Sequence, residues 1–150
     1  MQGIKRSVLL ILTMLFVGTF SAFAGNNQDS DTVDSSQSVY WENVMNAIIQ
    51  VESNGNSKAK HGSSVGAMQI TPLLVAECNN ILRGRRCKKR YKLSDRLSVK
   101  ESKEMFLLIQ SKYNPLRNIE QAIRSWNGGI HYSVQRTQRY LERVLSAMKG

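Results

Sequence analysis

The chain has 150 residues, of which 21 are Lys or Arg and 11 are Asp or Glu. This length fits one domain and leaves no room for a second. The positive charge lies mainly in residues 40–150, where 19 basic residues outnumber 8 acidic ones, so this part is expected to attract polyanions.

Residues 1–24 have the order of a secretory signal peptide. Lys5 and Arg6 precede an apolar run over residues 8–20. The small-residue site Ala-Phe-Ala at residues 22–24 follows, which predicts export and cleavage before Gly25. The apolar run is too short for a comfortable permanent membrane span. No cysteine follows the cleavage point to carry a lipid anchor, so we expect a periplasmic or extracellular protein.

Residues 25–38 are predicted to form a flexible linker. They are almost entirely Asn, Gln, Asp and Ser, with a single valine. Such a composition cannot bury enough apolar surface to fold. The folded domain is therefore expected over residues 39–150.

A helix is predicted from Trp41 to Glu52. Apolar residues recur there at spacings of three and four, and Glu52 lies four residues beyond Ile48, at the edge of the buried face. A carboxyl group at this edge is partly removed from water, which raises its pKa and suits a general acid. On spacing alone, the simpler interpretation is favoured, in which a glutamate ends a helix on its solvent side.

The rest of the domain is predicted to be mainly α. Residues 53–65 are rich in Ser, Asn, Gly and Lys, which indicates a long loop or a short irregular hairpin. A last helix is expected over about residues 132–148. The signals for the helices between them are Thr71-Pro72 before an apolar run to Leu82, Ser98 with Glu101 as a capping box, Asn118 as a cap, and Gly128-Gly129 as a stop.

Cys78 and Cys87 are the only cysteines. In an oxidising compartment, two cysteines so close in sequence predict one disulfide that closes a short loop. They lack the pair of histidines that a zinc site would need. His61 and His131 are single loop histidines, which are more often solvated than ligands. No metal and no cofactor is predicted.

Four short motifs follow one another in a defined order. They are Glu-Ser at residues 52–53, Gly-Ala-Met-Gln-Ile at residues 66–70, Ala-Ile-Arg-Ser-Trp-Asn-Gly-Gly at residues 122–129, and Thr-Gln-Arg-Tyr at residues 137–140 with Val144. In this order they resemble the soluble lytic transglycosylase family, which is related to goose-type lysozyme. The resemblance covers about residues 40–150. It departs from the family pattern at Trp126, where tyrosine is usual, and at Ala67, where leucine is common.

This resemblance implies a lysozyme-like fold of mainly α type, with a sugar groove between the 53–65 segment and the later helices. It implies that Glu52 is the catalytic acid of a peptidoglycan lytic transglycosylase. The acid protonates the leaving oxygen and then acts as a base on the muramic acid 6-hydroxyl, which attacks its own anomeric carbon. The substrate supplies the nucleophile, so one carboxylate is enough. This suits the domain, whose other carboxylates lie mostly in first turns of helices or among basic residues.

For the motif residues on the first side of the groove, we infer roles from the chemistry of each residue type. Ser53 either hydrogen-bonds beside the acid or satisfies backbone groups at the helix end, and the two interpretations are evenly matched. Gly66 lets the backbone approach the saccharide. Met68 and Gln69 are expected to line the cleft with an apolar contact and an amide. The alternative for Met68 is ordinary core packing.

The residues on the other side of the groove are Trp126, Asn127 and Tyr140. Asn127 is expected to hold an N-acetyl group of the sugar or the acid itself. Trp126 and Tyr140 offer aromatic faces, although one of them can belong to the core in so small a domain. Trp126 replaces a hydroxyl with an indole donor.

Residues 83–90, called the basic run below, hold six basic residues in eight positions. The plain interpretation is a solvated charged face. The functional one is attraction to anionic wall polymers and to the carboxylates of peptide stems. Export argues against nucleic acid as the partner, and aromatic residues are not interleaved with the charges beyond Tyr91.

Two other functions stay open. The first is a lysozyme-like muramidase, a hydrolase on the same fold, which needs a second carboxylate or a positioned water; Asp95 is a remote candidate. The second is a non-enzymatic glycan-binding or assembly factor of a transfer apparatus. Glu52 together with Gln69 and Asn127 argues against that factor, because a protein that only binds glycan has no need of an acid.

Overall fold

The computed structural model describes residues 35–150, so the predicted signal peptide and its cleavage site lie outside the described residues. The described part is mainly α-helical, as the sequence predicts. Its elements are α1 (Ser35–Ser53), β1 (Lys60–His61), β2 (Ser64–Val65), α2 (Pro72–Gly84), the 3₁₀ helix η1 (Leu93–Leu97), α3 (Val99–Tyr113), α4 (Ile119–Gly128) and α5 (Val134–Ala147).

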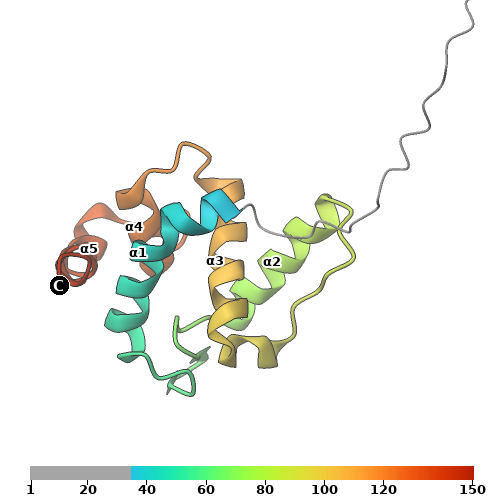
Figure 1. Cartoon of the computed structure of the whole chain (residues 1–150), viewed down its shortest axis with the longest axis horizontal. Helices are drawn as coiled ribbons and strands as arrows, with labels where there is room; N and C mark the ends of the chain where they lie inside the picture. The colour runs from blue at the N-terminus through green and yellow to red at the C-terminus, as the bar shows by residue number, and fades with distance from the viewer. Residues whose placement is uncertain (1–34) are drawn as a thin grey trace, which may run out of the picture.

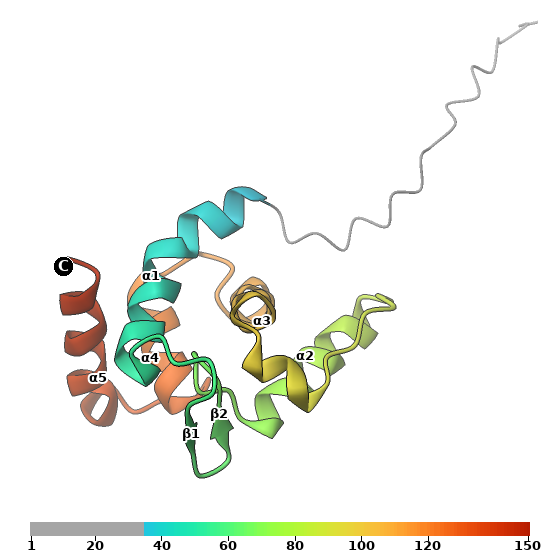
Figure 2. The ribbon, with the colours of Figure 1, turned by 60° about the horizontal axis from the view of Figure 1, so that its bottom comes forward.

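Helix α1 lies between two groups of helices (Figure 1). Helices α4 and α5 lie on one side of it and α3 on the other, while α2 packs on α3 at the side away from α5. The antiparallel β1–β2 hairpin pairs Lys60 with Val65 and His61 with Ser64, and it follows the C-terminal end of α1 at the edge of the molecule (Figure 2). Among the helices of residues 35–150, none combines the length and the hydrophobicity of a membrane-crossing segment.

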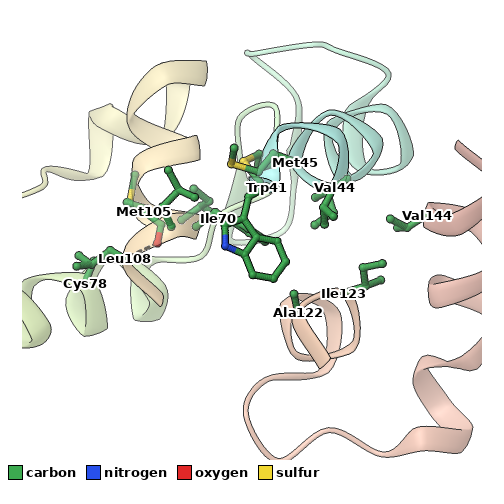
Figure 3. Packing of buried hydrophobic residues seen from close by; sticks show 14 of the residues in the cluster. Trp41, Val44, Met45, Ile70, Cys78, Met105, Leu108, Ala122, Ile123 and Val144 are labelled. Atoms are coloured by element: carbon green, nitrogen blue, oxygen red, sulfur yellow. Dashed lines mark hydrogen bonds between the residues drawn. The ribbon is translucent and has the colours of Figure 1, made fainter. Parts of the chain in front are cut away.

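The core is organised around Trp41 of α1, which is 1% exposed. Its ring meets Phe106 of α3 edge-on, with ring centroids 5.7 Å apart. Figure 3 shows Trp41 between Met105 on one side and Ile123 of α4 on the other. On the predicted inner face of α1, Trp41, Val44, Met45 and Ile48 are buried and Val51 is half-buried, which confirms the helical pattern there. A buried aromatic pair of this kind adds stability beyond its area.

The predicted helix starts are confirmed by their capping bonds. Thr71 Oγ1 accepts from the backbone N–H of Leu74 at 3.2 Å, and Asn118 Oδ1 accepts from that of Gln121 at 2.8 Å. Each bond satisfies a donor that the first turn of a helix leaves unpaired. Ser98 caps α3 in the same way, but Glu101 does not complete the capping box, because its carboxylate pairs with Lys89 at 3.1 Å.

Two helix ends differ from the sequence prediction. Helix α1 begins at Ser35 rather than at Trp41, so residues 35–38, which were assigned to the linker, are helical. The apolar pattern begins only near Trp41 and gave no signal for this extension, yet a helix that is already packed gains one backbone bond for each residue it adds. Helix α5 covers Val134–Ala147, slightly less than the expected 132–148.

The predicted disulfide between Cys78 and Cys87 is not formed in the structure. Cys78 lies on the inner face of α2, fully buried, and its thiol is 3.8 Å from the backbone carbonyl of Met105 on α3. Burial raises the pKa of this thiol to about 12. Cys87 packs against the edge of the same core. The short spacing of the two cysteines therefore reflects a buried thiol on a helix rather than a closed loop.

Candidate active site

The carboxyl group of Glu52 is held where α1 ends. The helix stops there because Asn54 and Gly55 take left-handed backbone conformations, with φ of 52° and 81°. Glu52 is half-buried, and the hydroxyl of Tyr140 on α5 donates to its Oε1 at 2.7 Å. Tyr140 is 8% exposed, so it acts as a buried partner of the acid. The aromatic face that the sequence prediction assigned to sugar contact is turned to the core.

Burial raises the pKa of Glu52 above its ordinary value of 4.5. The hydrogen bond from Tyr140 and the positive charges of Arg143 and His61 lower the pKa of Glu52, but burial outweighs them. The pKa of Tyr140 is itself raised by burial and by the neighbouring Glu52, so its hydroxyl stays a donor. The sequence predicted this direction from the place of Glu52 at the edge of the buried face.

Residues 66–70 form a tight turn beside the end of α1. Val65 and Ile70 bond to each other through both backbone pairs, and Ser53 Oγ donates to the carbonyl of Ala67 at 2.8 Å. Ser53 therefore satisfies backbone groups, which is one of its two predicted roles. Gly66, with φ of 89°, faces the backbone of η1, where a Cβ atom would lie 1.8 Å from the carbonyl oxygen of Arg96. This close approach requires a glycine whether or not a saccharide is present.

The side chain of Met68 takes the alternative role of core packing, and the side chain of Gln69 bonds within the protein, while its predicted sugar contact stays a prediction. Met68 is 0% exposed, so its side chain belongs to the core and cannot line a cleft in this structure. Gln69 Nε2 donates to the carbonyls of Gly66 at 2.9 Å and Ala59 at 3.2 Å, and its Oε1 lies 2.9 Å from Nδ1 of His61. The amide of Gln69 thus joins the 66–70 turn to the hairpin.

Trp126 ties α4 to the same turn. Its indole N–H donates to the backbone carbonyl of Met68 at 3.2 Å, and its ring lies against Phe106 with centroids 5.2 Å apart. The indole donor that replaces the usual hydroxyl therefore has a partner within the protein. Asn127 is exposed beside it, one residue before the end of α4. Of the residues predicted for this side, Asn127 keeps an open surface for a ligand.

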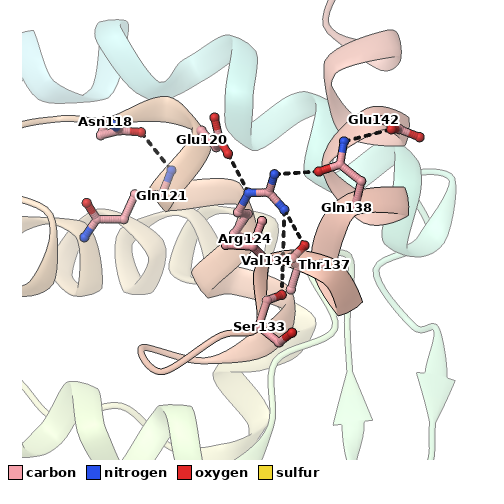
Figure 4. Close-up of polar contacts among 9 residues, drawn as sticks. All are labelled: Asn118, Glu120, Gln121, Arg124, Ser133, Val134, Thr137, Gln138 and Glu142. Carbon is pink, nitrogen blue, oxygen red and sulfur yellow. Dashed lines mark hydrogen bonds and ion pairs between the residues drawn. The ribbon is translucent and has the colours of Figure 1, made fainter.

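Arg124 locks α4 to α5 (Figure 4). The side chain is only 3% exposed, and its guanidinium bonds to Glu120 at 2.7 Å, to the carbonyl of Val134 at 2.8 Å, to Thr137 at 3.0 Å and to Gln138 at 2.7 Å. A buried guanidinium is tolerated because its donors are satisfied in this way. These bonds hold the start of α5 against α4 and so set the position of Tyr140 relative to α1.

Within residues 35–150, no second carboxylate is among the groups that act on the pKa of Glu52. Asp95, the remote candidate for a hydrolase, accepts from the backbone N–H of Lys92 at 2.7 Å and so caps η1. The same part of the chain has no group of three or more His, Cys, Asp or Glu side chains that would hold a metal ion.

Comparison with known protein families identifies the family of this chain. The family model of the transglycosylase SLT domain matches residues 33–144. The chain belongs to the transglycosylase SLT family. This match confirms the resemblance, and the lysozyme-like fold class with it. Comparison with curated proteins and with solved structures found no match.

Sequence reasoning assigned no role to four residues around this SLT-family site, which are Arg96, Arg124, Arg143 and His61. It set His61 aside as a solvated loop histidine and did not single out the others. Arg96 donates to the carbonyls of Ser63 at 3.0 Å and Ile70 at 3.2 Å, and Arg143 donates to the carbonyl of Val51 at 3.1 Å. Three of them are arginines in a strongly basic chain, so no pattern distinguished them from the solvated majority.

Replacing Tyr140 with phenylalanine is expected to raise the pKa of Glu52 further, because the bond that favours the carboxylate is lost. When the pKa of an acid is higher in the folded state than in the unfolded state, the free energy of unfolding falls as the pH rises through the folded-state pKa. At pH 8 we expect Tyr140→Phe to lower the free energy of unfolding by roughly 1.5–3 kcal/mol, and by less below pH 4.5, where the carboxyl is protonated in both states.

Carbon NMR of the Glu52 carboxyl group measures the pKa, and urea unfolding at both pH values measures the stability. Tyr132→Phe is the matched control, since Tyr132 precedes α5 and makes no bond to Glu52. A Glu52 pKa that falls or stays unchanged in Tyr140→Phe would contradict the assignment of this bond.

Proposed function

We propose that this protein is an exported lytic transglycosylase that cleaves the β-1,4 bond between MurNAc and GlcNAc in peptidoglycan and leaves a 1,6-anhydroMurNAc end. Membership of the SLT family supports the activity and the substrate class. The observation that carries the detailed reaction is the single half-buried carboxyl of Glu52, with a raised pKa and a tyrosine hydroxyl on its oxygen.

In the first step, Glu52 donates its proton to the glycosidic oxygen as the bond to the anomeric carbon of MurNAc breaks. A raised pKa keeps this proton in place at a higher pH than for an ordinary glutamate. The carboxylate that remains accepts the Tyr140 hydrogen bond, and Arg143 lies close enough to stabilise its charge. These partners act on the charged form that appears as the bond breaks.

In the second step, the Glu52 carboxylate takes the proton of the MurNAc 6-hydroxyl, whose oxygen bonds to the anomeric carbon. The proton balance closes, because Glu52 ends the cycle protonated, as it began. The desolvation that raises the pKa of Glu52 also makes its carboxylate a stronger base. No water enters the product, which separates this reaction from hydrolysis.

The two alternatives are less well supported. A muramidase needs a second carboxylate or a positioned water, and Asp95 is used as the cap of η1. A non-enzymatic glycan-binding factor gains nothing from a half-buried acid, because the partial removal of the Glu52 carboxyl from water disfavours its charged form even with the Tyr140 bond in place. Export itself is tested by intact-mass analysis, which should find the secreted chain starting at Gly25 rather than at Met1.

Digested peptidoglycan should yield muropeptides that end in 1,6-anhydroMurNAc. Mass spectrometry of the released products distinguishes these ends, which are one water lighter than the reducing ends that a muramidase leaves. Products with reducing ends would establish the hydrolase instead, and the absence of any release by folded protein would favour the binding factor.

Glu52→Gln is the control for this experiment, because an amide keeps the shape of the side chain but cannot give and retake the proton. Release should fall by at least about 10²-fold, the lower range of general acid–base catalysis. Glu142→Gln on the exposed face of α5 makes the same chemical change at a surface site and should stay close to wild type. If Glu52→Gln retains near wild-type activity, Glu52 is not the acid.

The basic run offers a second surface for contact with the cell wall. It covers the end of α2 and most of the segment between α2 and η1, on the side of the molecule away from α5 (Figure 1). Lys89 pairs with Glu101 and Glu104, the two nearby carboxylates of α3. The other five basic residues of the run are exposed. We propose that their charge attracts anionic groups of the cell wall, that is, stem-peptide carboxylates and wall polymers.

Arg86→Gln with Lys88→Gln should weaken binding to wall sacculi at low salt, measured by cosedimentation, and the difference should shrink as salt screens the charges. Lys100→Gln with Lys149→Gln changes the net charge equally at two other exposed positions and serves as the control. Equal binding of both double variants would show that the run is a solvated face. Stronger competition by RNA than by an anionic wall polymer would point to nucleic acid.

A further inference from the structure

A cavity of about 170 Å³ lies between α1 and the C-terminal end of α3. It is lined by Trp41 of α1, by Gln110 and Ser111 of α3, and by Asn114, Pro115 and Arg117 of the segment that follows α3. Trp41 and Glu52 lie on the same helix, about 16 Å apart along its axis at a rise of about 1.5 Å per residue. The cavity is therefore separate from the candidate active site.

Two buried side chains bring N–H groups without a partner to this cavity. Trp41 is 1% exposed and Gln110 is 2% exposed, and neither the indole nitrogen nor the Gln110 amide nitrogen has an acceptor within residues 35–150. In this part of the chain, every side-chain nitrogen or oxygen that is closed off from solvent has a hydrogen-bond partner. The two nitrogens must therefore reach an open surface, and the surface that both residues line is the cavity.

The direction of the Gln110 amide follows from its neighbours. Asn114 Oδ1 accepts from the backbone N–H of Asn118 at 2.9 Å, so Asn114 Nδ2 is the atom that donates to Gln110 Oε1, at 3.0 Å. A backbone N–H only donates, which determines the orientation of both amides. The nitrogen of Gln110 is thus the free end of this side chain, and both of its hydrogens are open to a ligand.

The open side of the cavity is cationic. Arg117 is exposed, its guanidinium lies over the ring of Tyr40 at 5.6 Å from the centroid, and it has no ion pair within residues 35–150. None of the lining residues is Asp or Glu. The carbonyl of Tyr113, in the last turn of α3, already accepts from Gln121 at 2.9 Å. The cavity therefore offers hydrogens and positive charge, which suit a ligand whose polar atoms are acceptors.

We propose that this cavity binds the terminal carboxylate of a peptide whose last residue is small, and that the peptide is a stem peptide of peptidoglycan. A carboxylate has only acceptor atoms, so it takes hydrogen bonds from Trp41 and Gln110 while Arg117 neutralises its charge. The faces of Trp41 and Pro115 supply apolar surface for a methyl group. An engineered cavity of about 150 Å³ holds benzene, so this one has room for an alanine end. The inference rests on the proposed function for the source of the peptide.

The two tryptophans of the chain provide the measurement. On titration with D-alanyl-D-alanine, the end of a stem peptide, the proton–nitrogen NMR signal of the Trp41 indole should shift to saturation. The signal of Trp126, whose N–H is bonded to the carbonyl of Met68, should stay in place, and its loss in Trp126→Phe assigns it. The same dipeptide with an amidated end should bind at least about 5-fold more weakly, because its charge is gone.

Two variants test the donors of the site. Gln110→Met keeps the length of the side chain and removes the free N–H groups, so affinity should fall by roughly 10-fold, while Asn114 keeps its bond to the carbonyl of Asn118. Arg117→Gln changes only an exposed charge and should weaken binding by about 3- to 5-fold, so the test does not depend on the folding of the core variant. Arg136→Gln, at an exposed position of α5, is the matched control and should bind like wild type.

A Trp41 signal that does not move in the folded protein would show that the cavity holds only water, and the proposal would be wrong. Equal binding of the amidated dipeptide would also overturn it. Tighter binding of L-alanyl-L-alanine would assign the site to the C-terminus of a protein partner and overturn the assignment to the wall. None of these measurements uses catalysis, so their outcome is independent of the outcome for Glu52.

Discussion

The hydrogen bond from Tyr140 to Glu52 joins two residues that are 88 positions apart, and the site depends on it. A carboxyl that is partly withdrawn from water needs a partner, and here that partner comes from the last helix. The surrounding bonds form a closed circuit. Arg124 fastens α5 to α4, the indole of Trp126 fastens α4 to the 66–70 turn, and Ser53 fastens that turn to the end of α1.

This circuit explains why the motif residues have few free polar atoms. Ser53, Gln69 and Trp126 all bond to backbone carbonyls of the turn, and they hold its strained geometry, in which Gln69 has φ of 53°. Short motifs of this kind serve first to build a rigid support for one acid. Asn127 and His61 are the exposed side chains next to this support.

The sequence was sufficient for the helices because their signals are local: capping residues, a first-turn proline and apolar spacing. It also placed Glu52 correctly, since four residues beyond Ile48 means one helical turn. It was wrong for the side chain of Met68, because its direction depends on a left-handed turn and on Arg96, which lies far along the chain. The roles of Arg124 and His61 depend on partners in other elements, and no spacing within the sequence encodes them.

The buried guanidinium of Arg124 has a consequence for how the domain opens. Separating α4 from the start of α5 would leave a charge inside the protein without its partners, at a cost of roughly 3–5 kcal/mol. Backbone amides in these two segments should therefore exchange their hydrogens with solvent together, as one cooperative unit. The β1–β2 hairpin is outside this unit and pairs over only two residues in each strand, so its backbone amides should exchange separately and sooner.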